Sequence, residues 1–117
     1  MSEQKSTEPN APLRLIVNAD DFGITDPASA KIVECHVAGS VTSTTLMANM
    51  PGAGFAARLA LDNPALGVGL HFNLTTGRPL SPAADVPSLI GNDGHFFKRA
   101  GLFARVAAGL VRAKDVE

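Results

Sequence analysis

Polar side chains that could share one site come from three separate segments of the sequence. Asp20 and Asp21 follow one apolar run, Asn49 follows a second, and His71 with Asn73 lies in a third. Two adjacent carboxylates are costly unless water, a cation or hydrogen-bond donors balance their charge. A divalent metal held by carboxylate and imidazole ligands is one such balance. Because neighbouring residues of an extended chain point to opposite sides, we expect one aspartate to bind the metal and the other to act on water.

The same residues also allow plainer interpretations. An Asp-Asp-Phe-Gly turn can be a loop with two solvated acids and a glycine at positive φ. His71 lies between Leu70 and Phe72, where a lone histidine is often a core or edge residue. The Asp-Phe-Gly triplet also resembles a protein-kinase motif, but the glycine-rich loop, strand lysine and catalytic loop of kinases are absent from the sequence. We exclude the kinase interpretation and keep the other two.

The elements that must position these residues alternate between strand and helix patterns. Thr25 and Asp26 are candidate N-caps, Pro27 suits a first helical turn, and Gly39 marks a helix end. Residues 75–95 are dense in Pro, Gly, Ser, Asp and Asn, which predicts a long loop of the kind that forms lids or flexible segments. The remaining patterns predict strands over residues 13–18, 41–47 and 67–74, and helices over about 27–38, 53–61 and 99–114.

This order predicts an α/β fold built from parallel β-α-β units with right-handed crossovers. Ligands of such folds gather at the carboxyl ends of the strands, where the polar residues above are expected. Residues 1–12 contain almost no apolar side chains, so we expect a disordered tail before a domain that covers residues 13–117.

Composition narrows the classes of partner. The 117 residues are 45% hydrophobic and 18% charged, as in a globular domain. A net charge of -1 gives no basic field for nucleic acid. No apolar run reaches the roughly 18 residues that span a bilayer, and the first residues lack the apolar core of a signal peptide. We therefore expect a cytoplasmic protein that binds neither nucleic acid nor membrane.

Three further residues receive structural roles. Cys35 has no partner for an intramolecular disulfide and is expected to be a small buried residue in a helix. His36 lies near the predicted end of the same helix, where imidazole meets the helix dipole favourably. His95 ends the polar loop and is expected at the surface.

Three stretches together resemble the YdjC-like, or ChbG-like, family of carbohydrate deacetylases. They are LIVNADDFG at 15–23, GSVTSTTL at 39–46 and GVGLHFNLTTGRPL at 67–80. The resemblance implies the first part of a TIM-barrel-like (β/α) fold and a metal-dependent hydrolase that removes N-acetyl groups from a carbohydrate such as a chitooligosaccharide. The implied cofactor is a divalent cation, magnesium.

The resemblance also implies a role for each matching residue. Asp21 and His71 would bind the metal, and Asp20 would be the general base that takes a proton from the attacking water. Adjacent-residue geometry also allows Asp20 and Asp21 to exchange these roles. The substrate would be an acetylated carbohydrate, although a related branch such as the hopanoid-associated relatives would act on a different acetylated or glycosylated molecule.

The sequence is about half the length expected for this family, whose barrels have roughly 250 residues. We therefore interpret the chain as a truncated N-terminal half that lacks a second metal-binding histidine and the general acid, and expect it to be inactive or marginally folded alone. The alternative is a non-catalytic sugar-binding or interaction module built from a half-barrel. Its open strand edge makes homo-oligomerisation a hypothesis.

Overall fold

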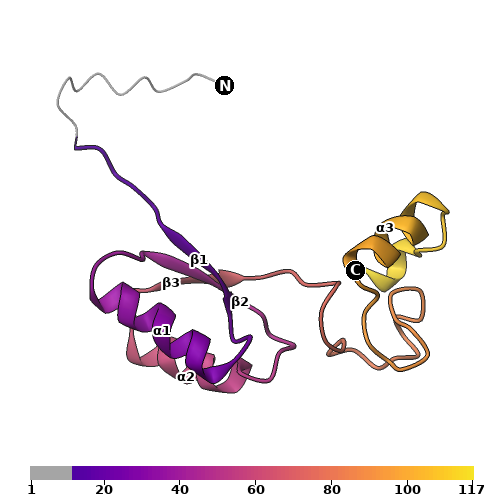
Figure 1. The fold of residues 1–117 in the computed structure, drawn as a ribbon, viewed down its shortest axis with the longest axis horizontal. Helices are drawn as coiled ribbons and strands as arrows, with labels where there is room; N and C mark the ends of the chain where they lie inside the picture. The colour runs from indigo at the N-terminus through magenta and orange to yellow at the C-terminus, as the bar shows by residue number, and fades with distance from the viewer. Residues whose placement is uncertain (1–11) are drawn as a thin grey trace.

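The computed structural model describes residues 12–117 and contains a three-stranded parallel sheet in the order β1-β2-β3. Helices α1 and α2 lie on one face of this sheet, and α3 belongs to a second group of segments beside it (Figure 1). The elements are β1 Asn18–Phe22, α1 Asp26–Val37, β2 Ser43–Leu46, α2 Ala53–Asp62, β3 Gly67–Leu70, α3 Arg99–Ala107 and the 3-10 helix η1 Ala113–Asp115. The predicted α/β class with parallel β-α-β units is confirmed.

Helix α1 begins and ends as its sequence predicts. The Thr25 hydroxyl accepts a hydrogen bond from the Ala28 N–H at 3.3 Å, which satisfies a free donor of the first turn. Gly39 follows the helix with φ of 82°. Its N–H donates to the His36 carbonyl, and the Ser40 N–H donates to the Cys35 carbonyl, the paired bonds of a glycine-terminated helix.

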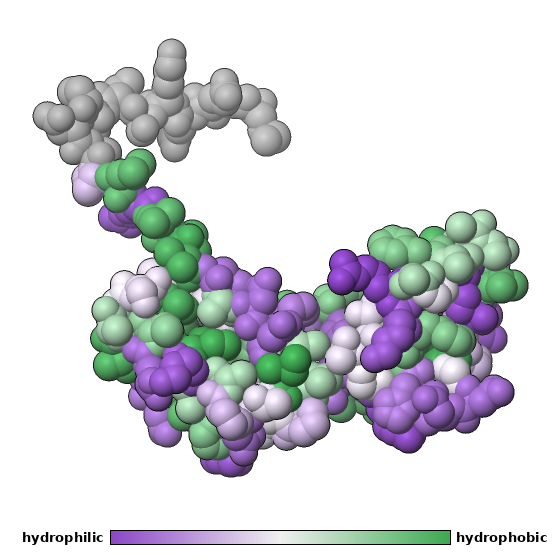
Figure 2. Space-filling view, in the orientation of Figure 1, coloured by the Kyte–Doolittle hydropathy of each residue, from purple (hydrophilic) through white to green (hydrophobic). Residues whose placement is uncertain are grey.

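The first strand lies further along the chain than predicted. We expected residues 13–18, but β1 spans Asn18–Phe22. The Val17 carbonyl accepts the N–H groups of Thr42 and Ser43, so pairing with the neighbouring strand begins only there. Leu15 and Ile16 are therefore 76% and 79% exposed rather than buried. Figure 2 shows apolar surface along the segment that leads into β1.

The other two strands are shorter than predicted. Strand β2 lies inside the predicted range, whereas β3 ends at Leu70 instead of residue 74. The His71 N–H donates to the Leu46 carbonyl in the last bond along β2. The Asn73 carboxamide oxygen then accepts the N–H groups of Thr75 and Thr76, which turns the chain away from the sheet. His71 and Asn73 thus follow the strand rather than lie in it.

The predicted long loop folds around an apolar cluster of its own. Val86, Leu89 and Phe96 form this buried cluster, and Leu102 of α3 packs against it. An antiparallel bridge joins Ile90 to Phe96. The loop is thus packed rather than free, and we refer to residues 75–117, which contain it together with α3 and η1, as the packed segment. Helix α3 ends at Ala107 rather than at residue 114, because Gly109 takes a φ of 67° and ends the helix as Gly39 ends α1.

A buried carboxylate fixes the end of the chain to this cluster. Asp115 is 5% exposed, and its Oδ2 accepts the Ser88 N–H at 2.9 Å and the Ser88 hydroxyl at 2.6 Å. Arg112 donates to both oxygens of the same carboxylate. Burial by itself would raise the pKa of Asp115, but the bonds from Ser88 and Arg112 lower it to about 2.

Some sequence predictions concern residues outside the described range, and others differ from the structure. The predicted tail lies outside the described residues apart from Pro12. Cys35 is free and only partly buried in α1. In residues 12–117, no helix has both the length and the apolar character needed to cross a membrane.

Gly52 permits the turn after β1 to pack against the start of α2. A Cβ atom on Gly52 would lie 2.8 Å from the Gly23 carbonyl oxygen and 2.8 Å from the backbone of Thr25. Real Cβ atoms do not approach backbone so closely. Because Gly52 has no side chain, the turn that carries Asp21 can pack closely against the start of α2.

We predict that Gly52→Ala destabilises the fold by about 1–3 kcal/mol, because the added methyl overpacks backbone that cannot rotate away. Gly54→Ala is the matched control, since its Cβ would meet only the Arg58 side chain at 3.9 Å. That change should stabilise α2 by up to about 1 kcal/mol. Urea unfolding followed by circular dichroism measures both; equal midpoints for the two variants would contradict the packing argument.

We predict that acid removes the stabilisation contributed by Asp115. Its folded pKa of about 2 lies below the unfolded value, so the native state binds fewer protons and stability falls as pH drops from about 4 to 2. Wild type and Asp115→Asn should therefore differ in urea midpoint at pH 5 and converge toward pH 2. Asp85→Asn, which changes an exposed carboxylate of the same segment, should keep the wild-type pH dependence. A constant difference between wild type and Asp115→Asn would contradict the assignment.

Candidate active site

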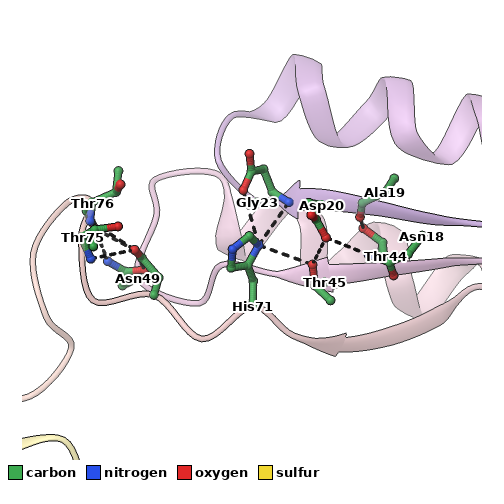
Figure 3. Close-up of polar contacts among 12 residues, drawn as sticks. Asn18, Ala19, Asp20, Gly23, Thr44, Thr45, Asn49, His71, Thr75 and Thr76 are labelled. Atoms are coloured by element: carbon green, nitrogen blue, oxygen red, sulfur yellow. Dashed lines mark hydrogen bonds and ion pairs between the residues drawn. The ribbon is translucent and has the colours of Figure 1, made fainter. Parts of the chain in front are cut away.

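The structure brings Asp20, Asp21 and His71 together at the carboxyl ends of the strands. Figure 3 shows Asp20 and His71 on either side of Thr45. Strand β1 ends at Phe22, and Asp20 and Asp21 are the two residues before it. His71 directly follows β3. The His71 Nδ1 atom lies 3.4 Å from the Asp21 Oδ1 atom. These three residues therefore meet at the carboxyl ends of the strands, the location expected from the parallel topology.

A β-bulge gives the two aspartates their directions. The register pairs Ala19 with Thr44 and then Phe22 with Leu46, so β1 contains one residue more than β2 across this interval. Asp21 takes a φ of 63°, and in residues 12–117 no other non-glycine residue has a positive φ. The expectation that the aspartates point to opposite sides rested on an extended chain, and Asp21 departs from that conformation. Bulges of this kind redirect side chains next to active sites, and aspartate tolerates the left-handed conformation better than most residues.

The middle strand links Asp20 to the same histidine. The Thr45 hydroxyl donates to the Asp20 Oδ1 atom at 3.1 Å, and its oxygen lies 3.4 Å from the His71 Nδ1 atom. The Asn18 carboxamide donates to the same Asp20 oxygen at 2.8 Å and accepts from the Ser43 hydroxyl. Asp20 is thus held by donors from β1 and β2 while it remains exposed to solvent.

Asn49 and Asn73 form a separate network. The Asn73 carboxamide donates to the Asn49 Oδ1 atom at 2.9 Å, and the Asn49 carboxamide donates to the carbonyls of Thr76 and Arg78. Figure 3 shows Asn49, Thr75 and Thr76 apart from the residues around His71. These two residues therefore fix the turn after β3, and they contact neither aspartate.

A cavity of about 220 Å³ lies beside His71. Asn49 and Asn73 line its polar side. Its other walls are mainly apolar and come from the segment after β3 and from the packed segment, with Phe72, Leu80 and Val86 among them. The cavity can therefore hold a molecule that presents a polar edge to His71 and an apolar face to Phe72.

The Asp21 and His71 side chains suit two positions around a divalent cation. Two donors that each lie about 2.1 Å from one cation are at most about 4.2 Å apart, and their 3.4 Å separation meets that limit. They are 53% and 30% exposed, so an ion can reach them from solvent. Among residues 12–117 no cluster of three or more His, Cys, Asp or Glu side chains could hold a metal, so any further ligands must be water or other groups.

The other histidines stay away from this site. The His36 Nδ1 atom lies 2.8 Å from the Val41 carbonyl oxygen, which ties the end of α1 to the following segment. His95 is exposed and its Nδ1 atom lies 3.3 Å from Asp93, as expected for a surface residue. Sequence reasoning missed Thr45 and Asn18. Thr45 lies in the strand predicted over residues 41–47, and its position in the middle strand is the signal that could have identified it.

Comparison with known proteins relates the chain to one group. The family model described as YdjC-like protein matches residues 14–117. The chain is 58% identical over 88 residues to a carbohydrate deacetylase of Geobacillus stearothermophilus, and this alignment covers 75% of this chain and 35% of the relative. It is 56% identical over 78 residues to a chitooligosaccharide deacetylase of Proteus mirabilis (strain HI4320), and this alignment covers 67% of this chain and 30% of the relative.

A solved structure supports the same relation. It is a protein of Enterococcus faecalis V583 provisionally described as a cellobiose-phosphate cleavage protein. It superposes with a TM-score of 0.76 and 35% identity over 86% of this chain and 38% of that chain. The chain thus spans about a third of the length of the curated relatives it matches.

Proposed function

The chain belongs to the YdjC-like protein family, and from that premise we propose that it carries the catalytic carboxylates and a histidine of a carbohydrate deacetylase. The reaction would hydrolyse the N-acetyl group of a sugar such as a chitooligosaccharide. The observation that carries this proposal is the meeting of Asp20, Asp21 and His71 at one edge of the sheet, with His71 3.4 Å from Asp21 and Thr45 in contact with both Asp20 and His71.

Asp21 and His71 would hold a divalent cation, magnesium in this proposal. Such a cation would polarise the acetamide carbonyl and stabilise negative charge that develops on its oxygen. Both donors come from the ends of strands held by backbone bonds, so their separation is set before any ion arrives. Two protein donors bind weakly, and catalytic metal sites commonly use three or more.

Asp20 would act as the general base. A water oxygen would add to the acetamide carbon while the water gives one proton to the Asp20 carboxylate. That proton would then pass to the amide nitrogen as the C–N bond breaks, which leaves the free amine and acetic acid, ionised to acetate. The Asp20 Oδ1 atom already accepts bonds from Asn18 and Thr45. Its Oδ2 atom makes no hydrogen bond to residues 12–117 and is the oxygen that could receive the proton.

The sugar would lie in the cavity beside His71, with a ring face against Phe72 and polar groups toward Asn49 and Asn73. We also propose that the three strands are the first part of a (β/α) barrel, because parallel β-α-β units continue into such barrels and the matched stretch covers only about a third of the relative's length. A non-catalytic half-barrel module has less support, since several relatives are named for deacetylation.

We predict that a chimera, in which this chain replaces the matching part of the Geobacillus stearothermophilus deacetylase, releases acetate from N-acetylated chitooligosaccharides. A chelator should stop the release, and Mg²⁺ should restore it. A folded chimera that releases no acetate, beside an active parent, would refute the deacetylase assignment. Release that survives the chelator would refute only the metal.

Within the chimera, Asp20→Asn should reduce kcat by about 10²–10⁴-fold, because the proton acceptor is lost. It should alter metal affinity little. His71→Ala should first raise the Mg²⁺ concentration needed for half-maximal rate. The matched control is His95→Ala, which removes the histidine of an exposed Asp–His pair with a similar 3.3 Å separation and should leave both quantities unchanged.

A further inference from the structure

We infer that Asn18, fixed by Ser43, is a positioning residue that holds one oxygen of the Asp20 carboxylate and leaves the other oxygen to accept a proton. The part in proton transfer rests on the proposed function, whereas the hydrogen bonds themselves do not. The Asn18 carboxamide donates to the Asp20 Oδ1 atom at 2.8 Å. The Ser43 hydroxyl donates to the Asn18 Oδ1 atom at 2.9 Å.

The two strands place these three residues beside one another. Asn18 and Asp20 are two positions apart on β1, so alternation along the strand directs both side chains to one face of the sheet. Asn18 is paired in register with Ser43 of β2, which makes their side chains cross-strand neighbours. The Ala19 carbonyl accepts the hydroxyl of the buried Thr44, a further bond that joins the strands at this point.

The orientation of the Asn18 carboxamide follows from the chemistry of its partners. An ionised carboxylate can only accept hydrogen bonds, so the carboxamide nitrogen must face Asp20. The carboxamide oxygen then faces Ser43, whose hydroxyl hydrogen must point at it. Because the carboxamide is bound at both ends, it cannot turn without losing a bond, and its donor stays directed at Asp20.

The side-chain donors around Asp20 engage only one of its oxygens. Thr45 supplies a second and longer bond to Oδ1, at 3.1 Å, while Oδ2 accepts none from residues 12–117. A proton taken from water would therefore go to Oδ2, because Oδ1 already accepts two hydrogen bonds. The Oδ1 atom of a neutral Asp20 is still an acceptor, so both bonds survive the transfer and no side chain has to rearrange.

The bonds can be tested in the full chain through the ¹H–¹⁵N signals of the Asn18 carboxamide, which are identified by their loss in Asn18→Ala. Asp20→Ala removes the acceptor and Ser43→Ala removes the hydroxyl, so each should move these signals. Ser43→Thr keeps the hydroxyl and should leave them near their wild-type positions. The matched control is Ser40→Ala, which removes a hydroxyl that donates to the Cys35 carbonyl at the same 2.9 Å and should move neither signal.

The effect on the reaction can be measured in the chimera with the deacetylase. Asn18→Ala should lower kcat by about 10–100-fold, because a general base that is no longer held in place transfers protons poorly. KM and the Mg²⁺ concentration for half-maximal rate should change little, since the substitution lies at the base and not at the metal donors. Ser43→Ala should lower kcat by about 2–10-fold, and Ser43→Thr should restore it. Asn63→Ala removes a carboxamide that donates to the Leu59 carbonyl, also at 2.8 Å, and should leave kcat unchanged.

Each other outcome decides something. Carboxamide signals that stay in place in Asp20→Ala would overturn the inference, and so would an unchanged kcat in Asn18→Ala. A raised Mg²⁺ requirement with full kcat at saturating Mg²⁺ would also overturn it, because Asn18 would then support a metal ligand. If Asn18→Ala does not fold, Ser43→Ala and Ser43→Thr decide by the same measurements. If the folded chimera with the unsubstituted chain releases no acetate, the proposed function fails, and the carboxamide signals alone support or overturn the positioning of Asp20.

Discussion

The arrangement of the site depends on one backbone constraint, the left-handed conformation of Asp21 in the bulge that ends β1. With φ of 63° the chain turns at Asp21, whose carboxylate lies 3.4 Å from the His71 imidazole, while the Asp20 carboxylate accepts a bond from Thr45. In a regular strand the two would lie on opposite faces. The turn is supported behind by Gly52, where any Cβ would collide with the backbone of Gly23 and Thr25. Packing of α2 thus supports the geometry of the site.

The parallel sheet supplies the second requirement, because it gathers the ends of three strands. Thr45 on the middle strand connects the aspartate of one outer strand with the histidine that follows the other. Beyond the sheet, the amides of Asn49 and Asn73 fix the turn that leads into the packed segment. That segment carries its own apolar cluster and a buried Asp115, and it forms a wall of the cavity beside His71.

Local signals predicted the helices and the topology well. The Thr25 cap and the Gly39 stop act through neighbouring backbone groups, so the sequence alone contains their physics. The limits of β1 could not be predicted in this way, because apolar residues such as Leu15 form a strand only where β2 offers a partner. The pairing of Asp21 with His71 was expected from a family resemblance, whereas the bulge and the position of Thr45 beside His71 depend on register between distant residues.

The most direct test of this account is a crystal structure of the chain grown with Mn²⁺, with an anomalous difference map. The account predicts Asp21 in the left-handed region, near the φ of 63° seen here, and a manganese peak bound to both the Asp21 carboxylate and the His71 imidazole. An Asp21 with negative φ, or a manganese ion bound away from His71, would contradict it.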